Sequence, residues 1–145
     1  MAERLKSKVT VETVKEFIQG SFPGDLGIEP LSIEDDKTAG RIVVDERHLH
    51  PGGLVHGGVW TALADTVAAW ATFRNIPQGS DFTTVELKLN VFAAGRVGDE
   101  LVAEARPLHV GRSTVALIVE IRKAADPDRL AAVFTLTQFV LPPRD

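Results

Sequence analysis

The stretch GGVWTALADTVAAWATF, residues 57–73, decides how this 145-residue chain can fold. It is apolar on nearly every side, and as a helix of about 17 residues it would be roughly 25 Å long. Because such a helix must be covered on most sides, we expect the remaining chain to wrap around it. Asp65 lies near its middle and is the only formally charged side chain between Arg47 and Arg74.

The carboxylate of Asp65 is costly to bury alone, so it has either a hydrogen-bonding partner or a chemical role. The first interpretation is structural, with a backbone group or a threonine satisfying the carboxylate. The second is catalytic, and the sequence His56-Gly57-Gly58 favours it. Glycines suit a tight backbone approach at a helix start, where free amides stabilise charge in acyl chemistry, although glycines also serve helix packing alone.

Two strands are predicted before this helix. A short helix is expected first, with Thr10 as its cap and Gly20 at its end. A turn at Pro23-Gly24 follows, and the strands are expected at residues 26–33 and 39–44.

Four further strands are predicted after the helix, because apolar and polar residues alternate and turns recur about every 12 residues. They cover residues 84–91, 100–108, 113–121 and 130–141. In the first of them the apolar residues alternate with Thr84, which places Thr84 on the polar face. The spacing of the turns predicts an antiparallel meander. The fold class is therefore α+β, with a long central helix wrapped by a curved antiparallel sheet of five to six strands.

The whole chain is most simply one domain, residues 1–145, with residues 1–24 as an N-terminal helical extension. Its net charge is −4 with both signs interspersed, which argues against nucleic acid as a partner. The lack of cysteine excludes disulfides, thiolate nucleophiles and cysteine metal sites. Residues 1–8 are unlike a signal peptide, and Asp65 interrupts the longest uncharged stretch, so we expect a cytoplasmic protein without a membrane span.

Gly57 and Asp65 are eight residues apart, which is about 12 Å along one helix axis. An oxyanion donor and a catalytic carboxylate must both come within about 3 Å of one reacting carbonyl. One copy can hardly supply both groups, whereas two copies packed antiparallel across a two-fold axis can, so we expect a homodimer with two shared sites. The residues three and four positions from Asp65 are small enough for close approach: Thr61, Ala62, Ala68 and Ala69.

The sequence VHGGV, residues 55–59, followed by Leu63-Ala64-Asp65-Thr66, resembles the signature of hotdog-fold acyl-CoA thioesterases, nearest to the phenylacetate-degradation and 4-hydroxybenzoyl-CoA type. The resemblance implies the hotdog fold, hydrolysis of an acyl- or aroyl-CoA thioester to the free acid and CoA, and commonly a tetramer built as a dimer of dimers. The order of elements is similar from residue 26 to 141. The likeness is sharpest at residues 50–71, Thr84-Val85-Glu86, Gly98-Asp99 and Gly111-Arg112.

The resemblance also implies roles for individual residues. Asp65 matches the catalytic acid, a nucleophile or a general base toward water. Gly57 matches the amide at the helix N-terminus that polarises the thioester carbonyl. His56 matches a histidine that shapes the loop and touches the thioester, and Thr84 matches a hydroxyl that positions the water. His50 falls where the family often has Asn or Gln near the carbonyl, a departure because an imidazole changes charge near pH 7.

Contacts with the substrate are implied for Gly58 and for Gly111-Arg112-Ser113, a segment that often meets the pantetheine or nucleotide of CoA. No cofactor and no metal is expected, since CoA is part of the substrate. The sequence does not identify the acyl group. The aromatic residues Trp60, Trp70 and Phe73 belong either to its pocket or to the core.

Three other interpretations fit parts of the pattern. A hotdog enoyl-CoA hydratase or dehydratase also pairs a histidine with a helix carboxylate, and His50-Pro51-Gly52 is faintly similar to that pattern, but the His56-Gly57-Gly58 start favours the thioesterase. A non-catalytic acyl-CoA-binding protein would bind without turnover. The histidines at positions 48, 50 and 56 with Asp65 are candidate metal ligands, although their segment is predicted to be a loop and no second acidic ligand is near.

Overall fold

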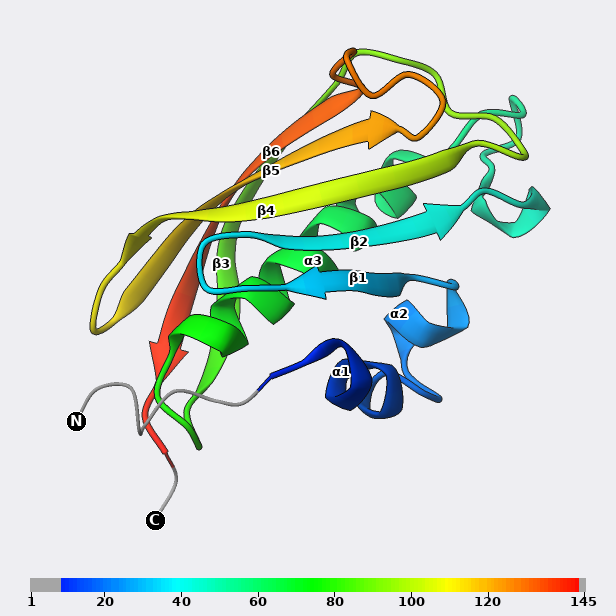
Figure 1. Cartoon of the computed structure of the whole chain (residues 1–145). Coiled ribbons are helices and arrows are strands. Elements are labelled where there is room, and N and C mark those ends of the chain that lie inside the picture. The colour runs from blue at the N-terminus through cyan, green and yellow to red at the C-terminus, as the bar shows by residue number, and fades with distance from the viewer. Residues whose placement is uncertain (1–8, 144–145) are drawn as a thin grey trace.

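The computed structural model describes residues 9–143. In this part of the chain six strands form one antiparallel sheet that curves around a long helix, α3 (Gly57–Asn75) (Figure 1). Two short helices, α1 (Val11–Phe17) and α2 (Phe22–Asp25), precede the sheet, and a 3₁₀ turn, η2 (Glu46–His48), precedes α3. The predicted α+β fold with a central helix is confirmed. The strands are β1 (Glu29–Ile33), β2 (Thr38–Val43), β3 (Asp81–Val91), β4 (Glu100–Val110), β5 (Thr114–Lys123) and β6 (Ala132–Leu141).

Most predicted boundaries agree with the structure to within a few residues. Thr10 caps α1 by accepting a hydrogen bond from the amide of Thr13. The expected turn at Pro23-Gly24 is instead part of α2, because Pro23 stands in the first turn of that helix, where a missing N–H costs nothing. The prediction about residues 1–8 lies outside the described residues. None of the helices within residues 9–143 combines the length and the apolar character that crossing a membrane requires.

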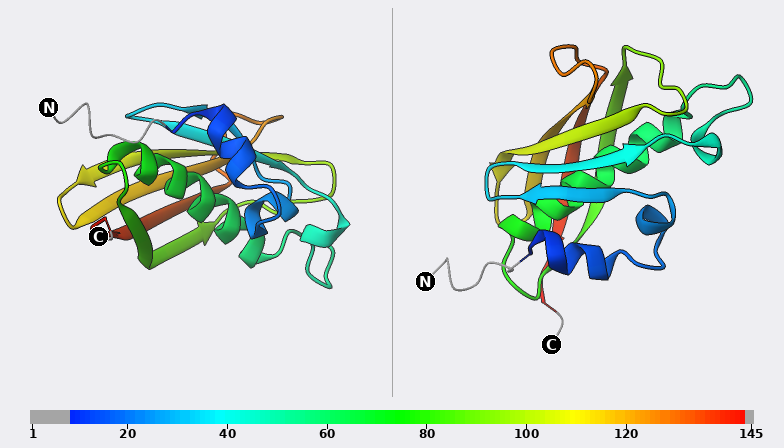
Figure 2. Two further views of the ribbon diagram at one scale, coloured as in Figure 1. Left: turned by 90° about the horizontal axis from the view of Figure 1, so that it is seen from below. Right: turned by 45° about the vertical axis from the view of Figure 1, so that its right-hand side comes forward.

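The order of strands across the sheet is β1-β2-β4-β5-β6-β3. Strands β4, β5 and β6 form a meander, as predicted, but β3 pairs with β6 at the far edge, so the prediction of a meander through all four strands is wrong. The reason is that β4 takes the free edge of β2. This leaves β3 as an edge strand, on the other side of α3 from β1 and β2 (Figure 2).

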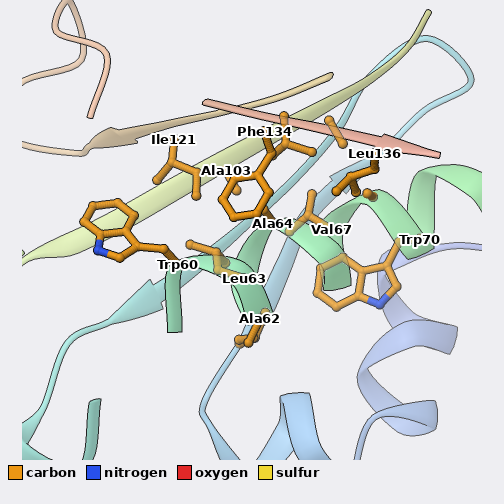
Figure 3. Close-up of a cluster of buried hydrophobic side chains, with 14 of the residues drawn as sticks. Trp60, Ala62, Leu63, Ala64, Val67, Trp70, Ala103, Ile121, Phe134 and Leu136 are labelled. Atoms are coloured by element: carbon orange, nitrogen blue, oxygen red, sulfur yellow. The ribbon is translucent and has the colours of Figure 1, made fainter. Parts of the chain in front are cut away.

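The helix packs on the concave face of the sheet through large side chains set among small ones (Figure 3). Trp60 of α3 and Phe134 of β6 are almost wholly buried in this core. Small residues on the sheet let the helix come close, since a Cβ on Gly40 of β2 would lie 2.7 Å from Val67 and 2.9 Å from Trp70. The three aromatic residues left open by the sequence therefore all pack in or against the core: Trp60, Trp70 and Phe73.

One stripe of α3 is left uncovered by the sheet, and we call it the open stripe. Its members follow one another at intervals of four residues and are exposed or half-buried: Gly57, Thr61, Asp65 and Ala69. Of the four small residues expected to admit a second helix, Thr61 and Ala69 lie on this stripe, while Ala62 and Ala68 face the core. Asp65 is thus half-buried in the single chain and lies on the open stripe.

Candidate active site

Asp65 and Thr84 are brought into direct contact. The hydroxyl of Thr84 on β3 donates a hydrogen bond to Asp65 Oδ1 on α3, with an oxygen–oxygen distance of 2.9 Å. No cationic side chain in the described part of the chain forms an ion pair with Asp65. The Asp65–Thr84 pair therefore fits both the structural and the catalytic interpretation. Thr84 satisfies the carboxylate, and it is also the hydroxyl that the resemblance places at the site.

A β-bulge turns Thr84 toward the helix. Across the β3–β6 pair, Thr84 is opposite Gln138 and Glu86 is opposite Thr137, which leaves Val85 as an extra residue without a partner. Since side chains alternate along a strand, this insertion puts Thr84 on the inner face and Glu86 on the outer face. The prediction that Thr84 lies on the polar face together with Glu86 is wrong for this reason.

Gln138 is a residue of the site that the sequence analysis missed. It lies on β6 opposite Thr84, its side chain is fully buried, and its Oε1 is 2.9 Å from Thr84 Oγ1. A signal was present in the sequence, since every second residue of β6 from Ala132 to Val140 is buried and Gln138 is the polar one among them. A polar side chain in the buried phase of a strand indicates a specific partner.

The N-terminus of α3 has one amide that is free to bind a ligand. His56 is the N-cap, and its Nδ1 accepts a hydrogen bond from the amide of Gly58 at 2.8 Å. The amides of Val59 and Trp60 both donate to the carbonyl of His56. Within residues 9–143 the Gly57 amide has no such acceptor, and the space beside its Cα is open. A free, exposed amide at the positive end of a helix dipole suits an oxyanion.

His50 and His48 have different surroundings. His50 Nδ1 accepts from the amide of Gly52 at 2.9 Å, and its ring lines a cavity of about 320 Å³ together with Trp60 and Phe92. His48 is fully buried, and both of its ring nitrogens form hydrogen bonds. Nδ1 accepts from the amide of Asp45, and Nε2 lies 2.8 Å from the carbonyl oxygen of Leu26. Both nitrogens of His48 are therefore occupied, and no group of three or more potential ligands in residues 9–143 is arranged around a metal position.

The segment Gly111-Arg112-Ser113 forms the hairpin between β4 and β5. It lies at the end of the sheet opposite to the N-terminus of α3 (Figure 1). Along the sheet it is close to the Asp65–Thr84 pair, since Val115 just after the hairpin is opposite Gln138. The single chain thus assembles Asp65, Thr84 and Gln138 in one place and leaves Gly57 about 12 Å away along the helix.

Comparisons with known proteins identify the family of the chain. Residues 52–129 match the profile of the Thioesterase superfamily. The chain belongs to this superfamily. The predicted resemblance to hotdog-fold acyl-CoA thioesterases is confirmed, and thioester hydrolysis is the general activity that this membership supports.

Three proteins illustrate what this thioesterase is similar to. The crystal structure of thioesterase HI1161 from Haemophilus influenzae superposes with a TM-score of 0.89 over 97% of this chain and 96% of that chain, at 28% identity. The 1,4-dihydroxy-2-naphthoyl-CoA hydrolase of Escherichia coli is 28% identical over 80% of this chain and 85% of its own length. The PaaI protein of the E. coli phenylacetic acid degradation operon shares the fold, with a TM-score of 0.79 over 90% of this chain and 91% of that chain at 23% identity.

Proposed function

We propose that this thioesterase hydrolyses an acyl- or aroyl-CoA thioester to the free acid and CoA at a site shared between two copies of the chain. The observation that carries the proposal is the separation on one open stripe of a free Gly57 amide and the hydrogen-bonded Asp65 carboxylate. Eight helical residues keep the two groups about 12 Å apart, too far to act on one carbonyl. The E. coli relative that acts on a naphthoyl-CoA supports an aroyl-CoA as one substrate class.

The edge strand β3 supports the pairing of two copies. Within the described residues it pairs with β6 alone, so its outer edge has unpaired backbone groups, and its side chains Val85, Leu87 and Val91 are 59%, 41% and 41% exposed. An exposed apolar edge strand is a template for pairing with another chain. A two-fold axis beside β3 would place the two α3 helices antiparallel, with the open stripes facing each other.

In the proposed reaction the thioester carbonyl oxygen accepts a hydrogen bond from Gly57 of one copy, while Asp65 of the other acts as a general base. The Thr84 hydroxyl donates a hydrogen bond to Asp65, so a lone pair of Thr84 remains to accept a hydrogen bond from the attacking water. Water adds through its oxygen to the carbonyl carbon and passes a proton to Asp65. The oxyanion then collapses, the C–S bond breaks, and the CoA thiolate leaves and takes up that proton.

A complementation experiment tests the shared site. The change Gly57→Pro replaces the amide hydrogen by a ring carbon and should preserve the helix, since proline is favoured at the first helical position, the extended His56 suits a following proline, and nothing lies within 4 Å of a Cβ. Gly57→Pro and Asp65→Asn should each abolish most thiol release from acyl-CoA and aroyl-CoA substrates. Co-expressed, the two variants should recover about a quarter of wild-type activity, because half of the dimers are mixed and each has one intact site.

The matched control is Gly57→Ala, which keeps the amide and meets open space, and it should stay close to wild-type activity. If the mixture of the two inactive variants gains nothing while each dimerises normally, both groups act within one copy and the shared site is wrong. If the wild-type protein releases no thiol from a panel of alkyl and aryl CoA thioesters, the proposed substrate class is wrong.

A further inference from the structure

The environment of Gln138 contains a conflict of hydrogen-bonding partners. Thr84 Oγ1 lies 2.9 Å from Asp65 Oδ1 and also 2.9 Å from Gln138 Oε1. Gln138 Nε2, in contrast, is buried without a hydrogen-bond partner among residues 9–143. A buried amide nitrogen that donates to nothing is costly, so this arrangement asks for a different assignment of the protons.

A count of protons resolves the conflict. A threonine hydroxyl has one proton to donate and two lone pairs to accept with, and an ionised carboxylate can only accept. If the proton of Thr84 goes to Asp65, the group of Gln138 that faces Thr84 must be a donor. The oxygen and nitrogen of a glutamine amide have nearly the same shape, and a half-turn of the amide exchanges them. That half-turn places Nε2 beside Thr84 and gives the orphaned donor its acceptor.

We propose that Gln138 is a positioning residue that donates a hydrogen bond from Nε2 to Thr84 and thereby commits the single proton of Thr84 to Asp65. This inference rests on the proposed function, in which Asp65 is the base. We call the two successive hydrogen bonds, from Gln138 to Thr84 and from Thr84 to Asp65, the relay. Its direction matters, because a Gln138 amide turned with its oxygen toward Thr84 would draw the proton of Thr84 to Gln138. Two acceptor oxygens would then face each other at 2.9 Å unless Asp65 were itself protonated, and a protonated Asp65 is no longer a base.

The fold fixes this relay through the bulge in β3. Gln138 is opposite Thr84 in the register and points inward with the regular alternation of β6, while the extra residue Val85 directly after Thr84 turns the Thr84 side chain to the same face. With Oδ1 of Asp65 occupied by Thr84, the second carboxylate oxygen remains for the attacking water. The buried amide therefore acts on the chemistry through Thr84 and does not itself touch the substrate.

A double-mutant cycle tests the relay. Gln138→Met keeps the length and volume of the side chain without its amide, and it should lower kcat about tenfold while KM changes less than about twofold, since it acts only on the orientation of the base. In a Thr84→Val background, which has no hydroxyl to orient, the same change should alter kcat less than about twofold. In a Thr84→Ser background, which keeps the hydroxyl, the loss of about tenfold should return.

An equal loss of kcat in all three backgrounds would mean that Gln138 acts as packing alone and would overturn the relay. Thr38→Val is the matched control. The Oγ1 of Thr38, on β2, is the other buried polar side-chain atom in residues 9–143 without a hydrogen-bond partner, and this change should leave kcat unaltered.

A measurement that needs no turnover separates failure of the relay from failure of the proposed function. By NMR, the side-chain amide protons of Gln138 should show an NOE to the side chain of Thr84, and their exchange with solvent should accelerate in Thr84→Val. An amide whose oxygen faces Thr84, with no such NOE, would overturn the relay even in a fully active enzyme. A wild-type protein that shows the NOE and releases no thiol would support the relay and contradict the proposed function.

Discussion

Asp65 and Asp99 are both half-buried carboxylates, yet their surroundings differ in kind. Asp99, in the loop between β3 and β4, accepts a hydrogen bond from the Arg96 amide and forms an ion pair with Lys123 at 3.0 Å. Asp65 lies on the open stripe of α3 and, within residues 9–143, its carboxylate accepts one hydrogen bond, from a neutral hydroxyl. A carboxylate surrounded by compensating groups stabilises the fold, whereas one left with free oxygen lone pairs is available for chemistry. The following variants test that difference.

Asp65→Asn should give the largest effect. The amide keeps the shape of the carboxylate but cannot accept a proton from water, so kcat/KM should fall by about a thousandfold or more. The melting temperature should change by no more than a few degrees, because the side chain is half-buried and forms no ion pair within residues 9–143. Thiol-release kinetics and thermal unfolding on the same preparation measure both quantities. A clear loss of stability with little loss of activity would make Asp65 structural, like Asp99.

Thr84→Val should give an intermediate effect, since it removes the one hydrogen bond that orients Asp65 while preserving shape. We expect kcat to fall about a hundredfold, the lower end of the loss found when one positioned donor in an active site is removed. Thr83→Val is the matched control, because Thr83 is the adjacent threonine of β3 and is exposed on the outer face opposite Phe139. Steady-state kinetics of both variants test this prediction. An equal loss of kcat in the two variants would contradict the conclusion that the bulge places Thr84, and not Thr83, in the site.

The sequence predicts the regular parts of this fold because they follow the periods of helix and strand. The apolar stretch gives α3, and the alternation from Val115 to Ile121 gives β5, whose inward side chains are all buried. The place of β3 beside β6 does not follow from any local period, because strand pairing joins residues that lie far apart in the sequence. The local sequence pattern therefore predicts where helices and strands lie in the chain better than it predicts which strands pair in the sheet.

The candidate site shows a second reason why sequence prediction stops short. The catalytic assignment of Asp65 depends on a motif, and its contact with Thr84 agrees with that motif. The bulge at Val85 could not be seen, because Val85, Leu87 and Leu89 continue an unbroken alternation through the position where the faces change. In the sequence Gln138 stands out only as a polar residue among the alternate apolar residues of its strand. That these alternate residues face the core is known only from the position of β6 in the sheet.

Asp99→Asn should give the smallest effect, on stability rather than on activity. Partial burial raises the pKa of Asp99, but the hydrogen bond from the Arg96 amide and the bond to Lys123 outweigh it and hold the pKa below its ordinary value. A carboxylate whose pKa is lowered by folding stabilises the protein above the pKa of the unfolded chain, about 3.9, and loses this contribution as pH falls through the lower folded value. The free energy of unfolding in urea should therefore drop by about 1 kcal/mol in Asp99→Asn at pH 7. Wild type and variant should converge as the pH is lowered below about 4, with kcat the same in both at pH 7. A gap in stability that persists undiminished at low pH would show that the charge of Asp99 contributes nothing, and the contrast with Asp65 would then rest on geometry alone.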